Sequence, residues 1–127
     1  MYMKVGEIMT TKFLAVKHDA NLKVVMKIMA DKNIRSVFVK PKDAGDVPGV
    51  IAVRDIVFKV LAKGMNPAQV KASDIVSKPL VCVDKDMKLE YAAMLMDKFN
   101  IARVWVKEGK DIIGVVSLLD LVRAALK

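Results

Sequence analysis

The sequence predicts a mixed α/β (α+β) fold in which two pseudo-symmetric β-α-β-β-α repeats pack as one module. Three observations predict it: an internal repeat, apolar runs of strand length, and apolar residues at helical spacing. Residues 5–40 align with 72–107 at an offset of 67 positions. Residues 49–62 then align with 114–127 at an offset of 65, because the first copy has two extra residues between the aligned blocks.

Each repeat is close to the size at which a single hydrophobic core becomes marginal, so we expect the two to fold together. We place the first repeat at residues 1–66 and the second at 67–127. Two similar modules that face each other are related by a pseudo-twofold axis, and any cleft between them occurs twice. The repeat therefore predicts two related clefts.

The first half of each repeat is predicted to be a short buried strand followed by a helix. The strands are the apolar runs Phe13–Val16 and Leu80–Val83. Each helix is expected to begin at an aspartate N-cap, Asp19 or Asp86, and to end at a left-handed asparagine. These asparagines are Asn33 and Asn100. Apolar residues at i, i+3, i+4 and i+7 predict one buried face per helix: Leu22, Val25, Met26 and Met29, and Leu89, Ala92, Ala93 and Met96.

The second half of each repeat is predicted to be a β-hairpin followed by an amphipathic helix. The hairpin strands are expected at Val37–Val39 and Gly49–Ile51, and at Val104–Val106 and Gly114–Val116. In both following helices, apolar residues stand 0, 3, 4, 7 and 8 positions after the first one. They are Val53, Ile56, Val57, Val60 and Leu61 in the first repeat, and Leu118, Leu121, Val122, Ala125 and Leu126 in the second.

The charge and the apolar runs bound the class of protein. Lys and Arg total 22 against 14 Asp and Glu, a formal net charge of +8, which suggests a polyanionic partner or a small phosphorylated ligand. Aromatic residues are only 6%, and no basic recognition helix is evident, so nucleic acid is disfavoured as a partner. No apolar run approaches the ~20 residues of a membrane span, and Met1–Gly6 lacks a secretory pattern. We expect a cytoplasmic protein with no membrane association.

Catalysis is hard to build from the available side chains. The single histidine, His18, precedes a predicted helix, and the single cysteine, Cys82, lies in an apolar strand where a buried thiol is expected. One Cys and one His cannot form a zinc site. No Ser-His-Asp set, Walker loop or glycine-rich dinucleotide motif is present. We therefore expect no enzyme activity, no metal and no required cofactor.

The segments that begin at Gly49 and Gly114 each join a strand to a helix and carry an aspartate in the first helical turn. In the second copy, Ser117-x-x-Asp120 can act as a capping box that satisfies free helix amides. In the first copy Ala52 replaces the serine, yet Asp55 remains. A carboxylate there interacts favourably with the helix dipole, and it can also accept hydrogen bonds from both hydroxyls of a ribose. Both interpretations, a helix cap and a ligand contact, therefore remain possible for this aspartate.

These residues carry a resemblance to a known family. The repeats open with Glu7-Ile8-Met9-Thr10 and Asp74-Ile75-Val76-Ser77, and each ends in Gly-Val-x-x-x-x-Asp. The pattern covers nearly the whole chain and resembles a tandem pair of cystathionine-β-synthase (CBS) domains, or Bateman module. The resemblance implies a regulatory module that binds AMP, ADP, ATP, or the related S-adenosylmethionine or NAD, in clefts between the repeats.

The resemblance also implies site residues. In the main cleft it places the ribose on Asp120, the phosphates near Ser117 and Arg103, and the base beside Val115. The opposite repeat is implied to contribute Thr10, Leu14, Ile34 and Arg35. The second cleft is implied to contain Asp55, Arg54, Val50, Ser77, Val81, Ile101 and Ala102. Because Ser36 and Ala52 stand where the second repeat has Arg103 and Ser117, we expect the Asp120 cleft to bind more tightly.

The family also implies self-association. CBS pairs commonly form head-to-head or head-to-tail dimers, and we expect a homodimer through the outward faces of the helices that begin near Val53 and Leu118. The chain is expected to act on a separate regulated protein or through its own oligomerisation. Two alternatives remain: a basic nucleic-acid-binding protein, and a structural dimerisation module without a ligand.

Overall fold

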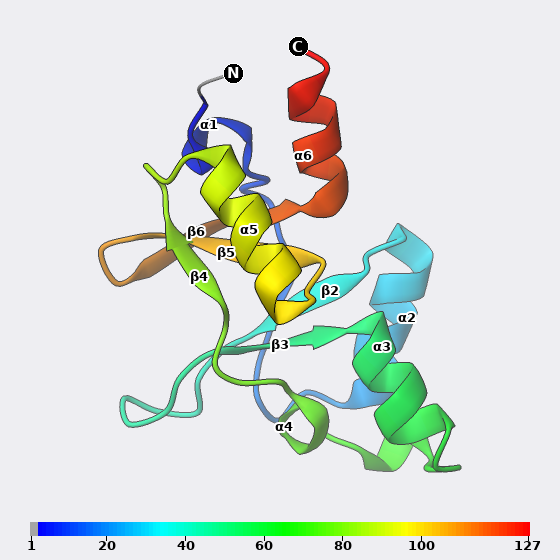
Figure 1. Ribbon diagram of the computed structural model, residues 1–127. Helices are drawn as coiled ribbons and strands as arrows, with labels where there is room; N and C mark the ends of the chain where they lie inside the picture. Colours follow the sequence, from blue (N-terminus) through cyan, green and yellow to red (C-terminus); the bar gives the residue numbers. More distant parts are fainter. Residues whose placement is uncertain (1–2) are drawn as a thin grey trace. The chain divides into compact units, whose positions relative to one another are not determined.

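The computed structural model describes residues 3–127, so the first two residues of the segment Met1–Gly6, which lacks a secretory pattern, lie outside the described part. The described chain divides into two compact units (Figure 1). Leu14–Leu80 form one, which we call the Asp55 unit. The residues up to Phe13 together with Val81–Lys127 form the other, the Asp120 unit. The predicted mixed α/β class is confirmed, with a three-stranded sheet in each unit.

The compact units do not coincide with the sequence repeats, because the repeats exchange their leading segments. The start of the first repeat joins the Asp120 unit, where the N–H of Val5 donates to the carbonyl of Met87 at 2.9 Å. The start of the second repeat joins the Asp55 unit, where the N–H of Ala72 donates to the carbonyl of Ala20 at 2.9 Å. Val5 is equivalent to Ala72 in the repeat, and Met87 is equivalent to Ala20. Each repeat therefore places its leading segment against the same part of the other repeat.

The Asp55 unit has a sheet in the order β1-β2-β3, with β1 parallel to β2 and β3 antiparallel to it. The sheet is followed by a continuous helical segment whose first turn is α-helical and whose remainder is π-helical. Its elements are β1 (Ala15–Val16), α2 (Leu22–Lys32), β2 (Ser36–Val39), β3 (Gly49–Ala52), α3 (Val53–Ile56), η1 (Val57–Leu61), η2 (Pro67–Gln69) and α4 (Ala72–Ile75).

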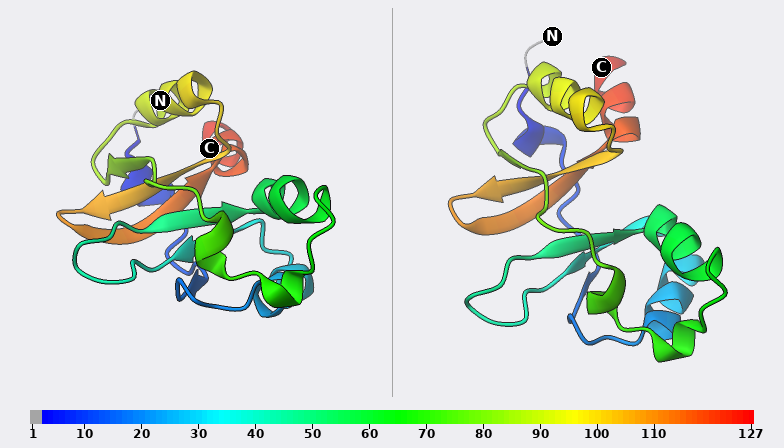
Figure 2. Two further views of the ribbon diagram at one scale, coloured as in Figure 1. Left: turned by 90° about the horizontal axis from the view of Figure 1, so that it is seen from below. Right: turned by 60° about the horizontal axis from the view of Figure 1, so that its bottom comes forward.

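The Asp120 unit repeats this plan with the sheet order β4-β5-β6. In Figure 1, β6 leads directly into α6, and Figure 2 shows α5 packing beside α6. Its elements are α1 (Val5–Ile8), β4 (Cys82–Asp84), α5 (Leu89–Phe99), β5 (Arg103–Glu108), β6 (Asp111–Ser117) and α6 (Leu118–Ala125).

The predicted starts of α2 and α5 are wrong by two residues. The N-caps are Asn21, whose side chain accepts from the N–H of Lys23 at 3.0 Å, and Lys88. Asp86 instead lies in the preceding turn, where its N–H donates to the side chain of Asp84 at 3.0 Å. The predicted ends are confirmed: Asn33 and Asn100 are left-handed C-caps with φ of 54° and 51°.

Each unit buries its own hydrophobic core. The predicted helix faces are largely confirmed, since Leu22, Val25 and Met29 of α2 are buried, as are Leu89, Ala92 and Met96 of α5. Met26 is half-buried, and Ala93 is exposed, contrary to its predicted place in the buried face.

The helices that follow the two hairpins depart further from a core-facing pattern. Ile56 and Val60 are buried, but the equivalent pairs Val53 and Leu118, Val57 and Val122, and Leu61 and Leu126 are all exposed. The first, third and fifth residues of each predicted pattern therefore face away from the core of their own unit, and Ala125, the fourth residue of the second pattern, is exposed as well. One apolar face covers the core, and a second apolar face is left on the surface.

Gly49 and Gly114 are equivalent positions with different surroundings. A Cβ at Gly49 would lie 2.6 Å from the backbone oxygen of Ser77 and would also clash with Val76. A Cβ at Gly114 would meet the Met9 side chain, which is flexible. We expect Gly49→Ala to lower the free energy of unfolding by about 2 kcal/mol, and Gly114→Ala by less, because only the first requires backbone to move. Urea denaturation of both variants measures this, and equal losses would contradict it.

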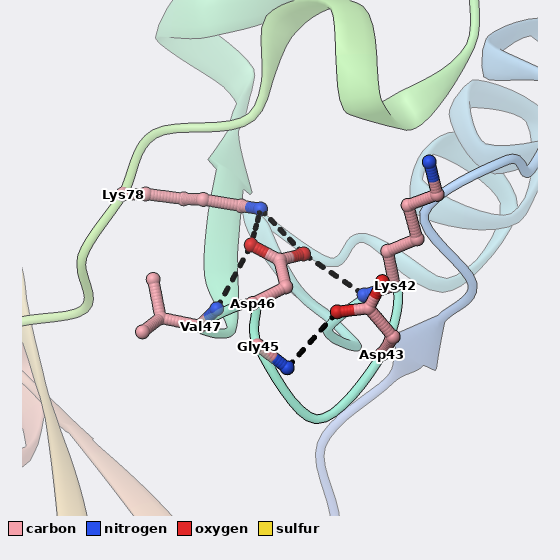
Figure 3. Close-up of polar contacts among 6 residues, drawn as sticks. All are labelled: Lys42, Asp43, Gly45, Asp46, Val47 and Lys78. Carbon is pink, nitrogen blue, oxygen red and sulfur yellow. Dashed lines mark hydrogen bonds and ion pairs between the residues drawn. The ribbon is translucent and has the colours of Figure 1, made fainter.

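The long hairpin loop of the Asp55 unit is fastened by one aspartate (Figure 3). Asp46 accepts from the backbone N–H groups of Lys42 and Val47, each at 2.8 Å. Its two carboxylate oxygens also accept from the ammonium of Lys78 at 2.7 and 2.8 Å. The N–H of Lys42 and the ammonium of Lys78 lower the pKa of Asp46 from 3.8 to about 2.

This carboxylate makes the loop sensitive to acid. Because its pKa is lower in the folded chain than in the unfolded chain, its stabilisation is fully present above about pH 4 and is lost as the pH falls towards 2. We expect Asp46→Asn to lower the melting temperature at neutral pH. The difference from the wild type should shrink as the pH falls through this range. A difference that stays constant down to about pH 2 would contradict this assignment.

Candidate functional site

The Asp120 half-site lies where β6 passes into α6. The Oδ2 atom of Asp120 accepts from the N–H of Ser117 at 2.8 Å, and the Oγ atom of Ser117 accepts from the N–H of Asp120 at 3.2 Å. The predicted capping box is therefore present. Asp120 is half-buried. Within residues 3–127, no hydrogen bond or ion pair engages its Oδ1 atom. The cap uses one carboxylate oxygen and leaves the other as an acceptor.

Two further predicted residues flank this carboxylate. Arg103 pairs with Ser117 across β5 and β6, which places the guanidinium stem and the hydroxyl side by side on the sheet. On the other edge of β6, Thr10 and Val115 exchange backbone hydrogen bonds at 2.9 and 3.0 Å. The structure therefore gathers five of the predicted main-cleft residues in one unit: Asp120, Ser117, Arg103, Val115 and Thr10.

The Asp55 half-site has the same backbone plan. The Oδ2 atom of Asp55 accepts from the N–H of Ala52 at 2.8 Å, as in the equivalent turn of the other unit. Ser77 exchanges backbone hydrogen bonds with Val50 at 2.9 and 3.0 Å, as Thr10 does with Val115. In addition, the Ser77 hydroxyl donates to Oδ1 of Asp55 at 3.2 Å.

Sequence reasoning missed Lys59 at this half-site. Its ammonium lies 3.1 Å from Oδ1 of Asp55 and donates to the carbonyl of Ile75 at 2.9 Å and to the Oγ atom of Ser77 at 3.3 Å. The only signal in the sequence is the i, i+4 spacing of Asp55 and Lys59, which is common on exposed helices. Nothing in the sequence shows that Ile75 and Ser77 close around the same ammonium.

The other predicted residues lie at different places in the two units. Arg54 is exposed, and its guanidinium lies 5.6 Å from the ring centroid of Phe58. Ile34 and Arg35 line an apolar groove of about 500 Å³ between α2 and α3. Leu14 packs against the core of the Asp55 unit. In the Asp120 unit, Val81 and Ile101 pack against the core, and the carbonyl of Ala102 accepts from the N–H of Leu118 at 3.0 Å.

The remaining candidate groups offer little reactive chemistry. Burial raises the pKa of the Cys82 thiol, an effect that nearby Lys107 partly opposes, so the thiolate is disfavoured at neutral pH. Across residues 3–127, no three His, Cys, Asp or Glu side chains gather as metal ligands. In the same part of the chain, no helix has the length and apolarity that crossing a membrane requires.

The two units share one plan and so define a duplicated module. In each unit a carboxylate in the first helical turn caps the helix, and a segment with a hydroxyl residue pairs with the preceding strand. The CBS domain family matches residues 5–62 and 72–127. The chain belongs to this family and carries a CBS pair, which confirms the resemblance seen in the sequence. Such pairs are generally regulatory, ligand-binding modules.

Relatives and solved structures agree with this assignment. An uncharacterized protein of Methanopyrus kandleri is 38% identical over 88 residues, covering 68% of this chain and 44% of the relative. The CBS domain-containing protein YhcV of Bacillus subtilis is 28% identical over 117 residues, covering 92% of this chain and 81% of the relative. The chain thus spans less than half of the first relative and most of the second.

A solved structure has the same fold over nearly the whole chain. The hexameric CBS-CP12 protein from bloom-forming cyanobacteria superposes with a TM-score of 0.88 at 32% identity. The match covers 96% of this chain and 67% of that protein. The fold is therefore that of a solved CBS pair.

Proposed function

We propose that this chain is a regulatory module that binds an adenosine nucleotide at the Asp120 half-site. The observation that carries the proposal is the Oδ1 atom of Asp120, a half-buried residue: no hydrogen bond or ion pair within residues 3–127 engages this oxygen. A carboxylate oxygen in this position accepts strong, charge-assisted hydrogen bonds from hydroxyl groups. The two hydroxyls of a ribose provide such donors.

The neighbouring side chains suit the rest of a nucleotide. The Ser117 hydroxyl accepts from the helix amide and keeps its own proton to donate, since a hydroxyl has one donor and two acceptor positions. Arg103, opposite Ser117 on β5, supplies the charge and the forked donors that bind phosphate. The half-buried Val115 offers an apolar surface for the base, and Thr10 supplies a second hydroxyl beside it.

We assign the response to the ligand to self-association and to a separate regulated protein. Equivalent apolar residues are exposed on α6 and on the segment formed by α3 and η1, and such faces are typical of protein interfaces. The proposed assembly is a homodimer. Binding of a nucleotide next to the first turn of α6 would then alter the helix that carries one of these faces.

The test is a calorimetric titration of the chain with AMP, ATP, S-adenosylmethionine, NAD and a DNA duplex, at low and at physiological salt. We expect at least one adenosyl ligand to bind with a weak salt dependence. Binding to DNA through phosphate contacts would instead weaken steeply as salt rises, because counterions are released.

The alternatives predict different results in the same titration. Salt-sensitive DNA binding without any adenosyl ligand would favour a basic nucleic-acid-binding protein, which the net charge of +8 keeps in view. Absence of binding by every ligand would favour a structural dimerisation module. Either result would reject the nucleotide site.

A further inference from the structure

We propose that Lys59 closes the Asp55 half-site, so that the chain binds one nucleotide rather than two. This inference rests on the proposed function for the meaning of the site, but the contact that carries it lies wholly within the Asp55 unit. The repeat predicts two equivalent sites, but in the structure only the carboxylate of Asp55 has a lysine against its Oδ1 atom.

The two carboxylates begin from the same position. Asp55 and Asp120 are equivalent in the repeat, and each uses Oδ2 to accept from the backbone N–H three residues earlier, at 2.8 Å in both units. The cap therefore fixes both side chains in the same orientation and leaves Oδ1 as the oxygen offered to a ligand. The two half-sites differ in what meets that oxygen.

At Asp55 the offered oxygen already has two partners. The Ser77 hydroxyl donates to it at 3.2 Å, and the Lys59 ammonium lies 3.1 Å away. The ammonium also donates to the Ile75 carbonyl and to the Ser77 Oγ atom, so it has three oxygen partners, two through hydrogen bonds and one through an ion pair. The side chain of Asp55 is only 16% exposed, while that of Lys59 is 42% exposed, so the carboxylate is largely covered and the lysine lies over it at the surface.

In the Asp120 unit the position equivalent to Lys59 carries no cation, because the residue four positions after Asp120 is Ala124. Ala124 is buried and has no polar atom in its side chain. Thr10 stands where Ser77 stands, but it is exposed. Both copies of the repeat therefore have the carboxylate, but only Asp55 has a lysine against it.

A ribose at Asp55 would have to displace an ammonium that already neutralises the carboxylate. The exchange replaces a charged pair and its hydrogen bonds with neutral hydroxyl donors, and it leaves the ammonium to find new partners. At Asp120, no hydrogen bond or ion pair within residues 3–127 has to be displaced from Oδ1. Lys59 thus acts as a specificity-determining residue that decides which of two equivalent carboxylates can receive a ligand.

The first test measures the contact without any ligand. Acetylation of the folded chain with a limiting reagent, followed by peptide mass spectrometry, compares Lys59 with Lys63, an exposed lysine four residues later. We expect Lys59 to react at least ~5-fold more slowly, because its ammonium is held by three oxygens. Asp55→Asn should reduce the difference. Equal rates in the wild-type chain would overturn the proposal.

The second test counts sites. Calorimetric titration with AMP, and with adenosine to remove the effect of phosphate charge, should give one more site per chain in Lys59→Met than in the wild type. Lys63→Met is the matched control and should leave the number of sites unchanged. Lys59→Ala, with thermal melting of each variant, guards against a loss of folding.

The gain in sites and the proposed function fail separately. A wild-type chain that binds no adenosyl ligand rejects the Asp120 site, while the gain between wild type and Lys59→Met still measures closure. If Lys59→Met gains no site, the closure is wrong. If Lys59→Met loses AMP binding, Lys59 is a ligand contact rather than a cover, and the proposal is overturned.

Discussion

Substitution of Asp120 by alanine is expected to weaken binding of the adenosyl ligand by at least ~100-fold. The change removes the carboxylate oxygen that no group within residues 3–127 engages, and with it two charge-assisted hydrogen bonds to a ribose. Such bonds contribute about 1.5–3 kcal/mol each, and a factor of 100 in affinity corresponds to about 2.8 kcal/mol. Calorimetric titration of the variant with the ligand bound by the wild type measures the loss.

The control for this substitution must separate the ligand contact from the helix cap. Asp120 also caps α6, and loss of a first-turn carboxylate costs about 0.5–1 kcal/mol of stability. Asp74 makes the same cap on α4, where its Oδ2 atom accepts from the N–H of Lys71 at 2.8 Å. We expect Asp74→Ala to cost similar stability and to leave the affinity unchanged. A similar loss of affinity in both variants would contradict a ligand role for Asp120.

The fold was predictable because the same pattern of strands and helices occurs twice in the sequence. A run such as Gly49-Val50-Ile51 is ambiguous alone, but its recurrence at Gly114-Val115-Val116, before another first-turn aspartate, fixes strand and helix in both copies. The left-handed ends at Asn33 and Asn100 were predictable for the same reason, since asparagine tolerates positive φ better than most residues.

The starts of the helices were not predictable from local chemistry. Asp19 and Asn21 are both good N-cap residues, and only a distant contact chooses between them. The N–H of Leu22 donates to the carbonyl of Val70 at 2.9 Å, and the Asn21 side chain donates to the carbonyl of Ala68 at 2.8 Å. The second of these partners belongs to η2, far along the chain, so the register of α2 is set by tertiary structure.

The carboxylates of the candidate site were predictable, but the contact of Lys59 with Asp55 was not. The repeat pointed to Asp55 and Asp120, and the family resemblance pointed to the hydroxyl residues Thr10 and Ser77 beside them. Lys59 reads in the sequence as an ordinary surface lysine. Its importance comes from the Ile75 carbonyl at the end of α4 and from the Ser77 hydroxyl just after that helix, which both lie next to its ammonium.

The apolar faces of the last helix in each repeat show a second limit of sequence periodicity. The spacing of Leu118, Val122 and Leu126 predicts that one side of α6 is buried, but it does not say against what. In the single chain these side chains are 50%, 57% and 83% exposed. The same three positions of the first repeat, Val53, Val57 and Leu61, are exposed as well. An apolar pattern kept in both copies, without a core to cover, is typical of an interface between molecules.

Substitution of Val122 by glutamate is therefore expected to convert the proposed homodimer to a monomer. Burying an unpaired carboxylate in an apolar interface costs several kcal/mol, so the dimer dissociation constant should rise by at least ~100-fold. Val57→Glu should act in the same direction, because Val57 is the equivalent residue on η1. Sedimentation velocity over a range of protein concentrations measures the change.

The matched control is Val47→Glu, which introduces the same charge at a valine that is 48% exposed in the hairpin loop. It should leave the association unchanged. Because Val122 is 57% exposed in the single chain, its substitution should leave the melting temperature of the monomer nearly unaltered. A monomeric wild type, or a Val122→Glu variant that associates as strongly as the wild type, would show that this face of α6 is not the interface. A lower melting temperature of the monomer would instead place Val122 in the core of its own unit.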